Sequence, residues 1–165
     1  MLHRLVVCFV VPALLLLCAC QDYDFKVNDK IVYSPTLFRN FTTPDPGLTS
    51  CLQQAIKDAA VTEGRQLTTL DCSFAGIESL DGLSAFTGLK ALRLSANQIR
   101  NLVELNRITT LETLYLDDNK IIDPVPLYQL PTLRHLDISG NPALQCPRPG
   151  NFTQVATVIL PQHCR

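Results

Sequence analysis

A 22-residue repeat fills most of the chain after residue 66 and constrains its fold more than any other feature. Three full copies span 67–88, 89–110 and 111–132, and a shortened fourth copy begins at Leu133. The copies open with the pattern L-x-x-L-x-L-x-x-N, from which the first departs at Cys72 and Ala75. A unit of this length cannot cover its own apolar face, so neighbouring copies must stack to bury a shared core.

This pattern resembles the leucine-rich repeat, and its 22-residue length resembles the bacterial internalin-type subclass. The resemblance implies an α/β-type leucine-rich-repeat solenoid with a short parallel β-sheet on its concave face. Two core columns are expected, formed by Leu70, Leu92, Leu114 and Leu136 and by Cys72, Leu94, Leu116 and Ile138. Asparagine amides can satisfy the backbone groups of the turns, so a buried ladder is expected at Asn97, Asn119 and Asn141. Ala75 has no amide, so the first turn must be satisfied differently.

A solenoid exposes apolar surface at both ends and needs a cap at each. Asp45 is a favourable N-cap residue, and Pro46 suits the first position of a helix. Apolar residues then recur at helical spacing, at Leu48, Cys51, Leu52, Ala55, Ile56 and Ala59. We therefore expect an N-terminal helical cap at 45–66, repeats at 67–146 and an irregular C-terminal cap at 147–165. Residues 20–44 fit either a small hairpin, with a turn at Asn28-Asp29, or a plain tether.

The N-terminus has the features of an export signal over residues 1–19. Positive Arg4 precedes an apolar run of 13 residues, Leu5 to Leu17, which is too short to span a bilayer as a helix. The sequence Leu17-Cys18-Ala19-Cys20 resembles the lipobox of bacterial lipoproteins, which implies that Cys20 becomes the first mature residue and carries acyl chains. An ordinary signal peptide cut near Ala19, or a membrane-anchoring segment, is the alternative.

The whole arrangement resembles small leucine-rich-repeat lipoproteins of the gammaproteobacterial envelope. Gln21 after the lipidated cysteine then implies the outer membrane, on its periplasmic or its surface side. Without Arg4, the chain has 13 basic and 15 acidic side chains and no basic stripe, so nucleic acid is not an expected partner.

Four cysteines remain beyond the signal and Cys20, and an exported domain with an even number favours two disulfides. Stacked strands lie about 4.8 Å apart, which puts Cys72 and a core-positioned Cys146 about 14 Å apart, too far to bond. The pairs Cys51–Cys72 and Cys146–Cys164 remain. A buried free thiol at Cys72 is one alternative, and zinc ligation is another, although no Cys-x-x-Cys spacing is present.

Side chains alternate along a strand, so the residues between the leucines point to the open face of the sheet. The candidate ligand-binding residues there are Asp71, Arg93, Tyr115, Asp137, Asp117 and His135. Tyrosine and arginine are enriched in binding hot spots. The alternative is a solvated face on which Asp71 and Arg93 form an ion pair of little value.

Two chemical interpretations of this face are weaker. His135, Asp137 and Ser139 share a face like a hydrolase triad, but alternate residues of a strand lie about 6.7 Å apart, too far for a triad. Asp117, Asp118 and Asp137 lack the loop spacing of a calcium site. We therefore expect no enzyme, cofactor or metal. The sequence favours a monomeric, membrane-anchored module that binds a protein or peptide, and the alternative is a structural envelope lipoprotein without a discrete ligand.

Overall fold

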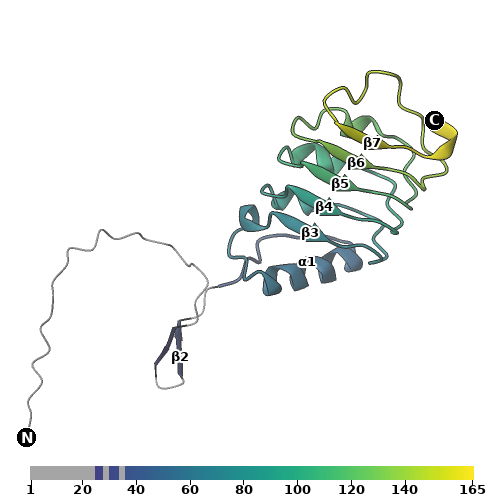
Figure 1. Cartoon of the computed structure of the whole chain (residues 1–165). Coiled ribbons are helices and arrows are strands. Elements are labelled where there is room, and N and C mark those ends of the chain that lie inside the picture. The colour runs from purple at the N-terminus through teal and green to yellow at the C-terminus, as the bar shows by residue number, and fades with distance from the viewer. Residues whose placement is uncertain (1–24, 28–29, 34–35) are drawn as a thin grey trace, which may run out of the picture. The chain divides into compact units, whose positions relative to one another are not determined.

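The computed structural model describes residues 25–27, 30–33 and 36–165, which fall into two units divided after Pro35 (Figure 1). In the first unit, β1 (Phe25–Val27) and β2 (Lys30–Tyr33) pair as antiparallel strands. This hairpin falls within 20–44, where the sequence left a hairpin and a tether open. The predicted signal and Cys20 lie outside the described residues.

The second unit is built on one parallel sheet whose strands follow each other in chain order (Figure 1). The strands are β3 (Thr69–Asp71), β4 (Ala91–Arg93), β5 (Thr113–Tyr115), β6 (His135–Asp137) and β7 (Thr157–Ile159). Leu70, Leu92, Leu114 and Leu136 face one another in register and are buried, as the repeat predicts. The predicted repeat solenoid with a parallel sheet is confirmed.

The C-terminal cap is more regular than the sequence indicates. We expected an irregular cap, but β7 extends the sheet by a fifth strand, in which Val158 pairs with Leu136. Val158 lies 22 residues after Leu136, and the segment VATVILPQH (155–163) keeps the spacing of the motif with valine at two leucine positions and histidine at the asparagine position. β6 therefore pairs with a fifth, degenerate copy of the repeat, and backbone hydrogen bonds carry the register into the cap.

Short 3₁₀ helices return the chain between successive strands of the repeats: η2 (Leu83–Ala85), η3 (Val103–Arg107) and η4 (Val125–Leu127). Two more lie outside the repeats, η1 (Gly64–Gln66) before β3 and η5 (Gln162–Cys164) after β7. Leu83, Leu105 and Leu127 project from successive return segments and are fully buried, so sheet and return segments enclose one continuous core. Among the described residues, no helix is both long enough and apolar enough to cross a bilayer.

The predicted asparagine ladder is confirmed, and each rung joins two repeats. The side-chain oxygen of Asn97 accepts from the Ile77 amide at 3.0 Å, and its nitrogen donates to the carbonyls of Cys72 and Leu94, both at 2.9 Å. Asn119 and Asn141 repeat this pattern one and two turns later. Because all three are buried, each rung satisfies backbone groups that water cannot reach.

Asp45 joins the helical cap to the first copy of the repeat. Asp45 caps α1 (Pro46–Asp58) by accepting from the Leu48 amide at 2.8 Å through one carboxylate oxygen. Its other oxygen accepts from the amides of Glu78 and Ser79, at 2.8 and 3.0 Å, in the first turn of the repeat. Gly47 makes this approach possible, because a side chain there would collide with the carbonyl of Ala75. One carboxylate therefore caps the helix and joins it to the solenoid.

Both disulfides form as the stacking argument predicts. Cys51 bonds to Cys72 with a Cα–Cα distance of 5.8 Å, and Cys146 to Cys164 with 5.2 Å. The first bond fastens α1 to the beginning of the sheet, and Cys72 is no free thiol. Our placement of Cys146 in the core is wrong, because its side chain is exposed. Leu144 fills the core instead, and the chain leaves the path of the repeat after it.

The ionisation of Asp45 reflects two opposed effects. Burial acts to raise the pKa of Asp45, but hydrogen bonds from the amides of Leu48, Ser79, Glu78 and Gly47 together outweigh it, so the pKa lies below the usual 3.8. A carboxyl group with a lowered pKa in the folded state stabilises that state above its unfolded pKa. This stabilisation is lost as the pH falls through the folded pKa.

Replacing Asp45 by alanine should lower the free energy of unfolding by about 2–4 kcal/mol at pH 7, because it removes a helix cap and leaves two amides unpaired. Asp45→Asn is the matched control, and it should lose less because one acceptor oxygen remains. Urea unfolding followed by circular dichroism measures both. The gap between wild type and Asp45→Asn should shrink below about pH 4. A gap that persists unchanged in acid would contradict the assigned role of the carboxylate.

Candidate binding face

The residues predicted to bind a ligand lie together on the solvent-facing side of the parallel sheet, called the sheet face below. Parallel pairing brings Asp71, Arg93, Tyr115 and Asp137 into one row across β3 to β6. β7 adds Ile159 to the end of this row, which the sequence analysis did not include because it did not predict the strand. The structure thus gathers the predicted residues on one surface, with Asp117 and His135 beside the row.

Arg93 interacts with Tyr115 and not with Asp71. The guanidinium carbon of Arg93 lies 4.1 Å from the centre of the Tyr115 ring, in a cation–π contact. The ion pair between Asp71 and Arg93, which we considered as an alternative, is not among the salt bridges of residues 36–165. The Asp71 carboxylate instead accepts from the amide and hydroxyl of Ser73, at 3.0 and 2.7 Å.

His135 flanks Tyr115 from the strand on the other side. The centres of the two rings lie 5.0 Å apart, and their planes are inclined by 46°. Tyr115 is half-buried between Arg93 on β4 and His135 on β6. The His135 Nε2 atom is buried and has no hydrogen-bond partner within the described residues. We call Arg93, Tyr115 and His135 the central stack.

The carboxylates beside the central stack are held by serine hydroxyl groups. Asp117 accepts from the Ser95 hydroxyl at 2.6 Å, and Asp137 accepts from the Ser139 hydroxyl at 2.6 Å and its amide at 3.0 Å. These bonds fix the direction in which each carboxylate presents its remaining lone pairs. The arrangement of His135, Asp137 and Ser139 therefore differs from a hydrolase triad, in which the histidine bonds both the serine and the acid. Here Ser139 bonds Asp137 directly.

Phe74 is a candidate functional residue that the sequence analysis did not select. Its side chain is 82% exposed, the largest value among the exposed apolar residues at the described positions. Its φ of +58° matches the values of +54°, +54° and +65° at the equivalent positions Ala96, Asp118 and Gly140. Stacking imposes this conformation, because the Phe74 amide donates to the Ser95 carbonyl at 3.0 Å and the next two turns bond likewise.

A bulky residue with positive φ is unfavourable, so the fold itself does not explain why phenylalanine occupies position 74. Among positions 74, 96, 118 and 140, the glycine at 140 is the sequence signal for a left-handed conformation. The phenylalanine at 74 gives no such signal. Strain and exposure together make Phe74 a candidate contact residue at the N-terminal edge of the sheet face.

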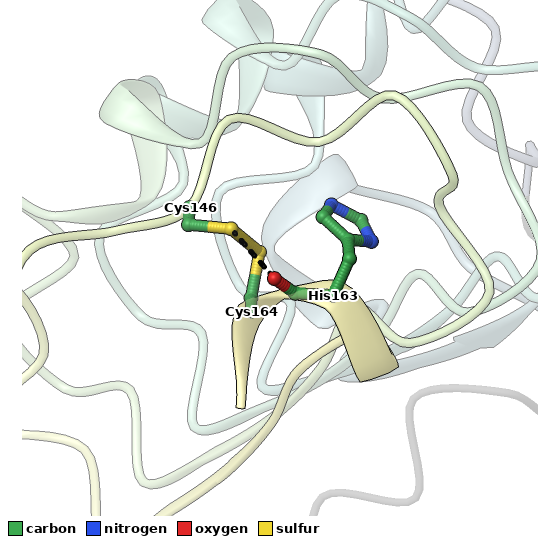
Figure 2. A group of neighbouring side chains, drawn as sticks. All are labelled: Cys146, His163 and Cys164. Atoms are coloured by element: carbon green, nitrogen blue, oxygen red, sulfur yellow. Dashed lines mark hydrogen bonds between the residues drawn. A yellow bond between two sulfur atoms is a disulfide. The ribbon is translucent and has the colours of Figure 1, made fainter.

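One group of side chains has the proximity expected of metal ligands, and it lies away from the sheet face. Cys146, His163 and Cys164 meet at the C-terminal cap (Figure 2). The two sulfur atoms are joined in a disulfide and are not thiolates, so they are poor metal ligands. The imidazole Nε2 of His163 lies 3.0 Å from the Leu144 carbonyl oxygen. The group is a structural cross-link, and it gives no ground for a metal centre.

A comparison with protein families identifies the repeats. A family model described as leucine-rich repeats in two copies matches residues 109–147. No curated protein matches the chain.

This chain is similar to solved structures of Listeria monocytogenes proteins, and the first two below support a common fold. Internalin inlF gives a TM-score of 0.58 at 23% identity, over 71% of this chain and 43% of its own. The functional domain of InlJ, described as including a cysteine ladder, gives 0.50 at 27% identity, over 66% of this chain and 27% of its own. Internalin C2 gives 0.48 at 33% identity, over 51% and 37%. This chain spans less than half the length of each.

The family match rests on the third and fourth copies of the repeat, and the structure shows the same turn and strand in the first two. The asparagine ladder and the parallel sheet in register at 22-residue intervals extend the assignment to the whole of 67–146. Residues 67–146 form a leucine-rich-repeat fold.

Proposed function

We propose that this protein is a membrane-anchored, non-enzymatic module that binds a protein or peptide through its sheet face. The observation that carries the proposal is the central stack, in which a half-buried tyrosine lies between a cation and an imidazole on neighbouring strands. Leucine-rich-repeat proteins such as the internalins generally bind other proteins, which supports the same conclusion.

The central stack is suited to binding because its side chains are already ordered. Tyr115 offers a large apolar ring and a polar tip, and contacts on both sides restrict its rotation before a partner arrives. Ordering a side chain in advance reduces the entropy cost of association. Arg93 contributes a guanidinium that forms no salt bridge within residues 36–165, so a carboxylate of the partner can accept a bidentate contact.

The proposed location follows from the lipobox and agrees with the disulfides. Acyl chains on Cys20 would hold the protein to a membrane, and Gln21 favours the outer membrane of a bacterial envelope. Two disulfides are typical of a protein that folds in an oxidising compartment such as the periplasm. We propose a monomer on either side of the outer membrane. A structural envelope protein with no discrete ligand is the alternative.

Lipidation at Cys20 can be tested by replacing it with serine. The variant should remain unprocessed or appear in the soluble periplasmic fraction, because the acylated thiol is absent. Membrane fractionation and mass spectrometry of the N-terminal peptide measure the change. Wild-type protein in the soluble fraction, with an unmodified N-terminal peptide, would refute the anchor.

The binding face can be tested once crosslinking in intact cells and mass spectrometry have identified the partner. Tyr115→Ala and Arg93→Ala should each weaken binding of the purified partner by about 1–2 kcal/mol, the scale of hot-spot residues. Arg100→Ala is the matched control for Arg93, because Arg100 is also exposed but lies outside the sheet face. Isothermal titration gives the affinities, and the melting temperature checks the fold. Equal losses in control and test variants would favour a different face, and the recovery of no specific partner would favour the structural alternative.

Phe74 allows stability and binding to be separated in one residue. Asparagine tolerates positive φ better than phenylalanine, so Phe74→Asn should raise the free energy of unfolding by about 0.5–1 kcal/mol. The same substitution should weaken partner binding, because it removes an exposed aromatic ring at the edge of the sheet face. Chemical unfolding and titration measure the two effects. Unchanged affinity in the stabilised variant would remove Phe74 from the binding face.

A further inference from the structure

A groove of about 570 Å³ runs beside α1, apart from the sheet face. One wall is a single face of the helix, because Thr49, Gln53, Ile56 and Lys57 are spaced so that they project together. The other wall is the chain from Leu37 to Thr43, which runs alongside the helix. Eight residues of helix separate Thr49 from Lys57, so the groove is about 12 Å long.

The second wall is fixed by packing, so the groove exists before any ligand binds. The Phe38 amide donates to the Val61 carbonyl at 2.7 Å, which holds one end of the wall near the end of α1. The rings of Phe38 and Phe41 both contact Phe86, which is fully buried, with centre-to-centre distances of 5.5 and 5.3 Å. Ligand sites in proteins are usually preformed hollows of this kind, with volumes of roughly 300–1,000 Å³.

The lining combines apolar and polar side chains, with cations at one end. Leu37, Phe38 and Phe41 supply most of the apolar surface, since Ile56 is only 3% exposed, and Thr42, Thr43, Thr49 and Gln53 are polar. Arg39 and Lys57 are the ionisable lining residues, and no carboxylate lines the groove. The bond between Phe38 and Val61 places Arg39 at the same end of the helix as Lys57. Neither cation takes part in a salt bridge within residues 36–165.

We propose that this groove binds an elongated amphipathic carboxylate, of which a single-chain fatty acid is the simplest member. The alkyl chain would lie along Phe38, Phe41 and Ile56, and the carboxylate would pair with Arg39 and Lys57. Charge complementarity selects this occupant, because a neutral apolar molecule would leave both cations without a role.

The test is a titration of the full chain with a polyene fatty acid whose fluorescence rises in apolar surroundings, kept below its micelle concentration. The acid should bind at least ~10-fold more tightly than its methyl ester, because two partly exposed ion pairs together contribute about that factor. The double variant Arg39→Glu with Lys57→Glu should abolish this preference. Its matched control, Arg100→Glu with Lys120→Glu, changes the net charge equally at exposed positions outside the groove and should keep the preference.

A second variant tests the apolar part. Gln53→Trp adds a large side chain at an exposed position of the helix wall, and it should reduce binding of acid and ester alike. Tyr115→Ala should leave fatty-acid binding unchanged, which separates this site from the sheet face. The proposal is overturned if ester and acid bind equally, if the control double variant loses the preference as well, or if binding occurs only to phosphatidylglycerol vesicles. If Gln53→Trp fails to fold, the charge variants alone decide.

Discussion

The buried hydrogen bond from an asparagine side chain to the preceding turn is the interaction on which the rest of the molecule depends. Asn97 joins the carbonyls of Cys72 and Leu94, one from each of two repeats, through the same amide nitrogen. Turns of a solenoid carry backbone groups that neither the sheet nor water can satisfy, and leaving them unpaired costs about 1–3 kcal/mol for each group. The ladder therefore fixes the spacing of the repeats, and the leucine core fills the space that this spacing defines.

The two ends of the ladder show how the caps are adapted to it. At the beginning, Asp45 accepts from the Glu78 and Ser79 amides of the first copy, and the disulfide from Cys51 to Cys72 holds the helix that bears it. At the other end, His163 lies 22 residues after Asn141 and contacts the Leu144 carbonyl oxygen with its imidazole. Each cap thus places a polar side chain where the ladder would otherwise stop.

Much of the fold could be predicted because the same contacts recur in each copy of the repeat. The register of β3 to β6, the asparagine ladder and both disulfides follow from one 22-residue alignment. β7 was not predicted because the motif is degenerate there: the segment VATVILPQH (155–163) repeats the pattern 22 residues after Leu133, with valine at two leucine positions and histidine in place of asparagine. The contact between Arg93 and Tyr115 was missed because a charge on a strand can turn toward either neighbour. Side-chain packing decides toward which neighbour Arg93 turns, and an alignment of the repeats contains no information on that packing.

The ladder also has a direction. Each asparagine both donates to and accepts from the repeat before it, so every repeat is fastened backward. The N-terminal cap bonds the first copy of the repeat, and the C-terminal cap bonds the third and fourth copies. One further 22-residue unit placed between two existing copies would find its partners on both sides already formed, and would move the C-terminal cap by one strand spacing of about 4.8 Å. The length of the sheet face is therefore independent of its ends, and duplication of a repeat can widen the binding surface without any change in either cap.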